Sequence, residues 1–427
     1  MIRFTEENGA LIAQSRNETI RIEGWGNNAL RVRTTLLKRM PENSHALTEN
    51  VAHCAKVSID ESNETAEIVN GKIKATVNGV GIICFYKDNE LILQEYYSYY
   101  YGSVRKEAIC YKIRSREYKG LASDDFKITV RFESDPKEKL FGMGQYQMPI
   151  LDLKGSVLPL EQRNSQVSVP FVISDKGYGM LWNNPSTGEA AFGTNITKWI
   201  SDESDMVDYW ITADDTPAQI VTNYTECVGR APVMSKDYLG LWQCKLRYRT
   251  QEEVLSVARQ YQKEGIKIDQ IVIDFFHWTV QGDWKFDKTY WPDPKAMVDE
   301  LHSMGIKVIV SVWPSVDRRS ENFQPMMDRG LLIRTERGAD QTYDYQGDCV
   351  EIDVFNPETR KYVWEVCKKN YYDYGIKAFW LDNSEPDYGV YDFDHYRYIE
   401  GPALSCSNIY PQLYSRVFYD KKKKPTA

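Results

Sequence analysis

The segment "WPDPKAMVDELHSMGIKVIVSVWP" (291–314) carries a helix signal followed at once by a strand signal. Asp293 is a favourable N-cap residue, and Pro294 suits the first helical position because its missing N–H is not needed there. Gly305 ends the helix, since glycine adopts the left-handed conformation that closes helices. The apolar run that follows predicts a buried strand. The segment therefore predicts one helix–strand unit of an α/β domain.

Two further segments repeat this pattern, namely "TQEEVLSVARQYQKEGIKIDQIVIDFFHW" (250–278) and "NPETRKYVWEVCKKNYYDYGIKAFWLDNSEP" (356–386). The first opens on a capping box, Thr250 with Glu253, and the second on Asn356-Pro357. In all three segments the helix ends in Gly-Ile-Lys, with the isoleucine expected to pack back on the helix. Such repetition predicts a (β/α)8 barrel or a doubly wound sheet. No Gly-rich phosphate loop follows a strand, which favours the barrel.

The preceding region has a different period. Apolar and polar residues alternate between the turn pairs Asn70-Gly71, Asn78-Gly79 and Asp88-Asn89, which predicts short antiparallel strands joined by tight hairpins. We therefore expect an α/β plus all-β protein, with a β-sandwich over residues 1–232 and a barrel domain over 233–427.

Composition excludes several classes of protein. The net charge of −8 argues against a nucleic-acid surface, and no apolar run approaches the roughly 20 residues of a membrane span. The eight cysteines form no CxxC pair and no Cys/His cluster, so neither a metal site nor a disulfide framework is expected. The N-terminus has no apolar signal region. We predict a cytoplasmic protein and leave open whether it forms a homo-oligomer.

The residues of chemical interest fall near the ends of the predicted strands. Asp274, Trp313 and Asp382 follow the three helix-stop glycines by nine, eight and seven residues. Barrel enzymes keep their active sites at the carboxyl ends of the strands, although a lone carboxylate there often only caps a helix. Two aspartates and several tryptophans together suggest a carboxylate in an aromatic-lined pocket, as in glycoside hydrolysis. The 29 tyrosines and 11 tryptophans suit sugar rings, or simply fill β-rich cores.

Among the acids of "AFWLDNSEPD" (378–387), Asp382 comes straight off the apolar strand and is the better nucleophile candidate. Glu385 and Asp387 are expected to support the loop. His277 and Asp283, in "DFFHWTVQGDW", shape substrate binding or belong to a solvated loop.

The chain resembles glycoside hydrolase family 31, the retaining α-glucosidases and α-xylosidases. The likeness covers roughly residues 20–420 and rests on motifs in the family's order. These are "FGMGQ" (141–145), "QRNSQVSVPFVISDKGYGMLWNNP" (162–185), "LGLWQCKLRYRTQEEV" (239–254), "IVIDFFHW" (271–278), "WPDP" (291–294), "VIVSVWP" (308–314), "DVFNPETR" (353–360) and "WLDNSEPD" (380–387). The wording "SVWP" and "WLDNSEPD" looks most like the α-xylosidase-related branch.

The resemblance implies a β-sandwich followed by a (β/α)8 TIM barrel, without metal or cofactor. It makes Asp382 the nucleophile that forms a glycosyl-enzyme ester, and Asp274 a hydrogen-bonding partner of the hydroxyls of the sugar at the non-reducing end. Aromatic pocket walls are implied at Phe276, Trp313 and Trp380. The segment 164–168 looks like the piece of the sandwich that reaches the pocket rim.

The sequence departs from the family in one respect. Retention needs a second carboxyl group, which in the family lies in a Trp-x-Gly-Asp-type motif after the nucleophile, with a sugar-binding arginine before it. The chain contains neither, and only about four of eight barrel units fit after residue 238. We therefore expect a partial barrel with an open strand edge, a truncated product of a longer enzyme, and little or no turnover.

Three rival functions remain open from the residues. The chain could be a non-catalytic carbohydrate-binding remnant, a transglycosylase that prefers an acceptor sugar to water, or an α-galactosidase-type barrel. The Trp-Leu-Asp context of Asp382 fits family 31 better than the last of these.

Overall fold

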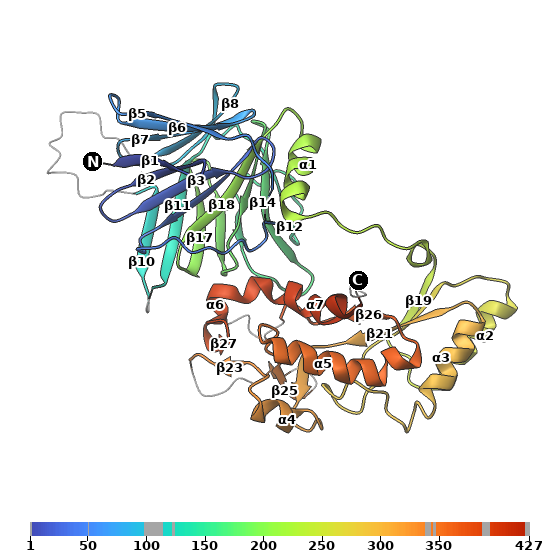
Figure 1. The fold of residues 1–427 in the computed structure, drawn as a ribbon. Helices are drawn as coiled ribbons and strands as arrows, with labels where there is room; N and C mark the ends of the chain where they lie inside the picture. The colour runs from blue at the N-terminus through green and yellow to red at the C-terminus, as the bar shows by residue number, and fades with distance from the viewer. Residues whose placement is uncertain are drawn as a thin grey trace. The chain divides into compact units, whose positions relative to one another are not determined.

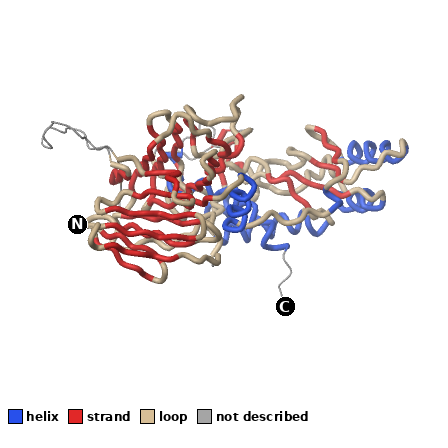
Figure 2. Tube along the Cα trace, turned by 90° about the horizontal axis from the view of Figure 1, so that it is seen from above, coloured by secondary structure: helices blue, strands red, loops and turns tan. Residues whose placement is uncertain are grey.

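The computed structural model describes residues 2–49, 51–97, 114–121, 124–337, 343–344, 347–386 and 393–422. The chain divides into two compact units, Met1–Ala231 and Pro232–Ala427. The first is built almost wholly of antiparallel strands, and the second alternates helices with parallel strands (Figures 1 and 2).

The first unit contains three antiparallel sheets. An eight-stranded sheet has the order β1 (Arg3–Glu7), β2 (Ala10–Gln14), β3 (Thr19–Gly24), β4 (Ala29–Thr35), β18 (Val207–Ala213), β15 (Tyr178–Trp182), β14 (Val167–Ser174), β12 (Leu140–Gln145). A five-stranded sheet has the order β10 (Arg116–Gly120), β11 (Phe126–Glu133), β17 (Ile196–Ser204), β16 (Gly188–Phe192), β13 (Val157–Pro159). The other five-stranded sheet runs in chain order through β5 (Lys56–Asp60), β6 (Thr65–Asn70), β7 (Ile73–Asn78), β8 (Ile83–Lys87) and β9 (Glu90–Gln94).

All three sheets contribute to one apolar core, which includes Leu30 of β4, Val130 of β11 and Ile68 of β6. The expected sandwich is therefore confirmed, and the structure adds the third sheet. That sheet is the predicted run of hairpins, because its strands turn at the three Asn-Gly and Asp-Asn pairs. The helix α1 (Pro217–Val228) closes the unit and packs on β15 and β18.

A buried ion pair links β4 to β18 within this core. The Arg31 guanidinium donates to both carboxylate oxygens of Asp208, over 3.1 and 2.6 Å, and neither side chain is more than 2% exposed. The Asn183 amide donates to the same carboxylate over 2.8 Å. Arg31 also donates to the Asn43 carbonyl, and so ties the segment after β4 to the sheet.

The second unit is built on a four-stranded parallel sheet, in the order β19 (Trp242–Lys245), β20 (Gln270–Ile273), β21 (Lys307–Val312), β26 (Ala378–Leu381). Each strand is followed along the chain by one main helix: α2 (Gln251–Lys263), α3 (Pro294–Ser303), α5 (Pro357–Asn370) and α7 (Tyr410–Lys422). These elements are four consecutive β/α units of a TIM barrel, and the expected fold class is confirmed.

Short elements lie between the main ones. They are η2 (Lys236–Tyr238), β22 (Ser315–Asp317), α4 (Phe323–Asp328), β23 (Arg334–Thr335), β24 (Tyr343–Asp344), β25 (Asp348–Glu351), η3 (Tyr372–Tyr374), η4 (Phe393–His395), β27 (Tyr396–Arg397), α6 (Ala403–Cys406) and η5 (Ser407–Ile409). Among the described residues no helix is both long and apolar enough to cross a lipid bilayer.

The predicted helix starts are where the sequence placed them. Thr250 accepts a hydrogen bond from the Glu253 N–H, Asp293 from the Ala296 N–H, and Asn356 from the Glu358 N–H. Proline occupies the first turn of α3 and of α5. These caps satisfy N–H groups that would otherwise have no partner in the helix.

The three Gly-Ile-Lys tripeptides also close their helices in the same way. Each glycine has a positive φ, between 70° and 106°, and each following isoleucine N–H donates to a carbonyl five residues back. Ile306 and Ile376 are buried as expected. Ile266 is 50% exposed, so the expected packing of this residue is wrong. The structure also ends α5 at Asn370 and inserts η3 before Gly375.

The two faces of the parallel sheet are chemically different. The face toward the helices is apolar and belongs to the core of the unit: Ile271, Ile273, Val308, Val310, Val312, Phe379 and Leu381. Because side chains alternate along a strand, the intervening residues point to the other face. There the register places polar and aromatic side chains side by side on neighbouring strands, such as Ser311 of β21 opposite Trp380 of β26.

Candidate active site

The three strand-end residues predicted from the sequence each come directly after a strand. Asp274 follows β20, Trp313 follows β21 and Asp382 follows β26. Continuing the alternation of each strand places all three on the face away from the helices. The register sets Asp274 level with Ser311, and Trp313 level with Asp382. The Asp382 N–H donates to the Val312 carbonyl over 3.2 Å, which extends the ladder to the nucleophile candidate itself.

The two aspartates are close enough to influence each other's charge. Burial raises the pKa of Asp274, the N–H of Phe275 opposes this with a 2.7 Å hydrogen bond, and the negative charge of Asp382 raises the pKa further. Asp382 receives the Asn383 N–H over 3.0 Å. Each carboxylate is thus oriented by the backbone N–H of the next residue. A pair of carboxyl groups in unequal environments is typical of acid–base and nucleophilic sites.

The loops behind these aspartates hold two non-glycine residues in the left-handed region. Phe276 has φ 63° and Asn383 has φ 55°. For a bulky residue such as phenylalanine this conformation costs of order 1–3 kcal/mol, and such residues concentrate in binding and catalytic sites. The Arg247 guanidinium carbon lies 4.7 Å from the centre of the Phe276 ring.

The three aromatic residues predicted to line the pocket differ in how exposed their rings are. Trp380 is 46% exposed on the helix-free face and offers an open ring, and Phe276 is half-buried. Trp313 is only 5% exposed, because the rings of Phe275 and Trp278 cover it with centres at 5.3 and 6.1 Å. Its indole N–H donates to Ser311 over 3.2 Å. Trp313 therefore lies beneath the site, whereas Trp380 and Phe276 are within reach of a ligand.

His277 is not part of a solvated loop, and that alternative is wrong. Its side chain is fully buried, its Nδ1–H donates to the Asp274 carbonyl over 3.0 Å, and the Tyr371 hydroxyl donates to its Nε2 over 2.8 Å. Burial lowers the pKa of His277 to about 4, so the ring is neutral at pH 7. Asp283 is buried as well and accepts a hydrogen bond from Ser320. His277 therefore ties the backbone of Asp274 to the end of α5.

The lowered pKa predicts a pH dependence of stability. His277 binds a proton near pH 6.5 in the unfolded chain but only near pH 4 in the folded protein. Between these pH values the unfolded state therefore holds more protons than the folded state. The unfolding free energy accordingly falls as the pH drops from 6.5 to 4. We expect the native protein to lose about 2–3 kcal/mol more unfolding free energy between pH 7.5 and pH 4.5 than His277→Gln does. Urea unfolding of both proteins at the two pH values measures this. Equal losses would contradict the assignment.

The remaining predicted positions are Glu385, Asp387 and the segment 164–168. Glu385 lies in the loop after Asp382 with a half-buried side chain, next to the buried Pro386. Asp387 lies outside the described residues. The segment 164–168 lies in the first unit, where it leads into β14.

Sequence reasoning missed three residues of this face. Ser311 is buried level with Asp274, and Cys244 of β19 lies close enough for the Asp274 charge to help burial raise its thiol pKa. Arg247 follows β19 by two residues. The alternation within "WQCK" and "KVIVSV" contains the signal for the first two, since they share a face with the strand-end residues. No local pattern marks Arg247.

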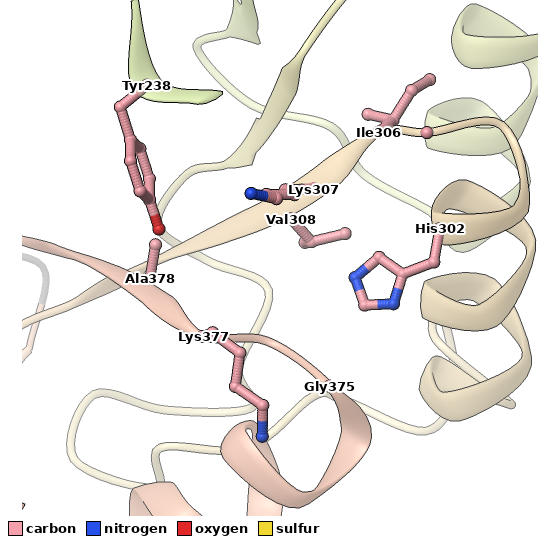
Figure 3. A pocket seen from close by; sticks show the side chains of 9 residues that line it. Tyr238, His302, Ile306, Lys307, Val308, Gly375, Lys377 and Ala378 are labelled. Carbon is pink, nitrogen blue, oxygen red and sulfur yellow. The ribbon is translucent and has the colours of Figure 1, made fainter. Parts of the chain in front are cut away.

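A separate cavity lies at the opposite ends of the strands. Its volume is about 370 Å³. It is lined by Tyr238, by Lys307 at the start of β21, by Ala378 at the start of β26 and by Lys377 just before that strand (Figure 3). Another, of about 840 Å³, lies beside α5 and includes Phe286 and Tyr362. Neither contains Asp274 or Asp382. TIM-barrel enzymes have their active sites at the carboxyl ends of the strands. We therefore take the aspartates, and not either cavity, as the candidate active site.

Within the described ranges no cluster of histidine, cysteine and acidic side chains has the arrangement of a metal site. The donor set at the strand ends is two carboxylates, aromatic rings and an arginine. These groups recognise hydroxyls and ring faces of a sugar.

Paired aspartates and aromatic rings beyond the strand ends of a β/α barrel define the class of barrel glycoside hydrolases. The chain belongs to glycoside hydrolase family 31. Residues 231–426 match the model described as the family 31 TIM-barrel domain, and residues 19–190 match the family 31 N-terminal galactose mutarotase-like domain.

The chain is similar to several known members. It is 46% identical to "Uncharacterized family 31 glucosidase ORF2" of Pseudescherichia vulneris, over 98% of this chain and 81% of that protein. It is 31% identical to an α-xylosidase of Saccharolobus solfataricus, over 70% of this chain and 41% of that protein. The crystal structure of an α-xylosidase from a soil metagenome, complexed with xylose, superposes with a TM-score of 0.93 at 46% identity. The match covers 98% of this chain and 63% of that one.

Proposed function

We propose that this chain carries the nucleophile of a retaining, exo-acting α-glycosidase that acts on α-xylosidic or α-glucosidic bonds. The observation that carries the proposal is the position of Asp382, which is the first residue after β26, faces away from the helices, and lies within electrostatic range of Asp274. The similarity to proteins named as α-xylosidases and a glucosidase supports the same substrate class.

In this proposal an oxygen of the Asp382 carboxylate attacks the anomeric carbon of the terminal sugar. The carbon–oxygen bond to the leaving group breaks, the leaving oxygen takes up a proton from an acid, and a glycosyl ester remains on Asp382. Water then hydrolyses the ester. Asp274 accepts hydrogen bonds from hydroxyls of the same sugar, and the exposed ring of Trp380 and the ring of Phe276 face its apolar surface.

The acid and base steps need a second carboxyl group at roughly 5–5.5 Å from the first. Asp274 is separated from Asp382 by the whole of β21, and the backbones of strands two positions apart are about 10 Å apart. The proposal gives Asp274 the hydrogen bonds to the sugar hydroxyls and assigns the acid and base role to none of the described residues. Because these 427 residues contain no Trp-x-Gly-Asp motif, we expect little turnover of ordinary glycosides by this chain alone. A leaving group that needs no proton, such as fluoride, avoids the first of the two steps.

The proposal is tested with 5-fluoro-α-D-xylosyl fluoride and its glucosyl counterpart, followed by intact-mass analysis. We expect one fluoroglycosyl adduct per chain, on a peptide that contains Asp382, and none on Asp382→Asn. An adduct elsewhere, or no adduct at all, would overturn the proposal. Sugar binding without an adduct would instead identify a carbohydrate-binding protein. Comparing the labelling rates of the two probes shows which sugar is preferred. The cytoplasmic location and the oligomeric state stay predictions from the sequence.

A further inference from the structure

Arg247 is a cation at the candidate site that the reaction described above does not use. It lies two residues after β19, and its guanidinium carbon is 4.7 Å from the centre of the Phe276 ring. Lys245, on the same segment, is paired with Glu253. Over the described part of the chain Arg247 forms no ion pair with a carboxylate, and its side chain is half-buried. A half-buried arginine without an anionic partner retains N–H donors for another acceptor.

The surroundings of Arg247 hold it against the aromatic ring. Phe276 is fixed by its left-handed backbone and by edge contacts with Phe275 and Trp278, whose ring centres lie at 4.3 and 6.4 Å. A guanidinium over a ring face is attracted by the negative face of the ring, which leaves its N–H groups directed outward from its edges.

The same segment lies beside the first aspartate. Lys245 is paired with Ile273 in the parallel ladder, so the residue after it, Leu246, comes level with Asp274. Arg247 is the next residue, and its stacking on Phe276 brings its guanidinium to the loop that follows Asp274. A neutral sugar whose hydroxyls reach Asp274 comes within range of this guanidinium, which supplies donors where the aspartate supplies acceptors.

We propose that Arg247 is a further substrate-binding residue, which donates hydrogen bonds to a ring hydroxyl of the sugar that lies against Phe276. This inference rests on the proposed function, because it needs a sugar in this site. The alternative to substrate binding is a purely structural role, in which Arg247 only holds the strained Phe276 in place. The two roles differ in what the loss of the donors does to affinity.

The test is the binding of D-xylose and of methyl α-D-xyloside to the full chain, measured by titration calorimetry. Arg247→Met keeps a long apolar stem over the Phe276 ring but removes every donor, and Arg247→Lys keeps the charge with different donor geometry. We expect about 10- to 100-fold weaker binding for Arg247→Met, a smaller loss for Arg247→Lys, and none for the control Arg249→Met, which alters an exposed arginine of the same segment.

Deoxy sugars supply the second measurement. Removing the hydroxyl that Arg247 contacts should weaken binding to the native protein and leave binding to Arg247→Met nearly unchanged, as expected for a pair of interacting groups. Binding by Arg247→Met within twofold of the native protein would overturn the inference, as would a lower thermal unfolding temperature with unchanged affinity. If the native chain binds neither sugar and takes no fluoroglycosyl label, the proposed function fails as well. If only the inference on Arg247 fails, the native chain still binds the sugars, so the two failures are distinguishable.

Discussion

Replacing Asp382 with alanine is expected to abolish the release of fluoride from α-D-xylosyl fluoride, with a rate loss on the order of 10⁴-fold. In the proposed mechanism the Asp382 carboxylate supplies the attacking atom, and no other acidic side chain among the described residues directly follows β26 on the helix-free face. With the native chain we expect a burst of about one fluoride per protein, because fluoride leaves without a proton while hydrolysis of the ester requires a base. A fluoride electrode with rapid mixing measures both.

A small anion separates a lost nucleophile from a damaged fold. In Asp382→Ala, azide can enter the space of the carboxylate, form a carbon–nitrogen bond at the anomeric carbon and displace fluoride. The expected product is the β-xylosyl azide, with inverted configuration. Asp237→Asn is the matched control, since it alters an exposed aspartate at the other end of the sheet, where it pairs with Lys307, and should keep the burst. A burst of native size from Asp382→Ala would refute the assignment.

The second large effect is expected in the first unit. Asp208→Ala leaves the Arg31 guanidinium buried without its anion, and breaking a buried pair in this way costs about 3–5 kcal/mol. For a unit of this size the loss corresponds to a fall in unfolding temperature of roughly 10 °C. The Asn183 amide loses its acceptor at the same time, and the Arg31 guanidinium that donates to the Asn43 carbonyl is no longer held by the carboxylate. Differential scanning calorimetry of the two-unit chain measures the shift.

Two comparisons show whether burial is the cause. The double variant Arg31→Met/Asp208→Leu removes both charges and fills the space, so it should be more stable than Asp208→Ala alone. Glu226→Ala removes one partner of the exposed pair with Arg230 and should change stability by less than about 1 kcal/mol. A shift for Asp208→Ala no larger than that for Glu226→Ala would contradict the expectation.

The elements that the sequence predicted best are those determined by neighbours in the chain. Caps and stop glycines act within one helical turn, so Thr250, Asp293 and Asn356 placed the three helix starts. Gly265 and Gly305 placed two helix ends, whereas α5 ends at Asn370, before η3. The strand-end positions of Asp274, Trp313 and Asp382 followed directly.

The features that the sequence did not predict depend on distant partners. His277 is held by Tyr371, 94 residues further on, so nothing around "DFFHW" distinguishes a buried ring from a solvated one. The cover of Trp313 and the stacking of Arg247 on Phe276 likewise join separate strands. Ile266 is exposed although its two counterparts are buried, and the tripeptide that the three segments share does not distinguish them.

The alternation of the parallel strands also limits how the gene can change. Between Ala378 and Asp382 the side chains alternate between the helix core and the opposite face, and a strand shifted by one residue exchanges its two faces. A deletion of one codon in this stretch would turn Leu381 to the helix-free face and turn Asp382 into the apolar core. An insertion or deletion of two residues would keep each side chain on its original face of the sheet. Insertions and deletions that survive selection here should therefore occur in pairs of codons, a parity rule that substitutions do not obey.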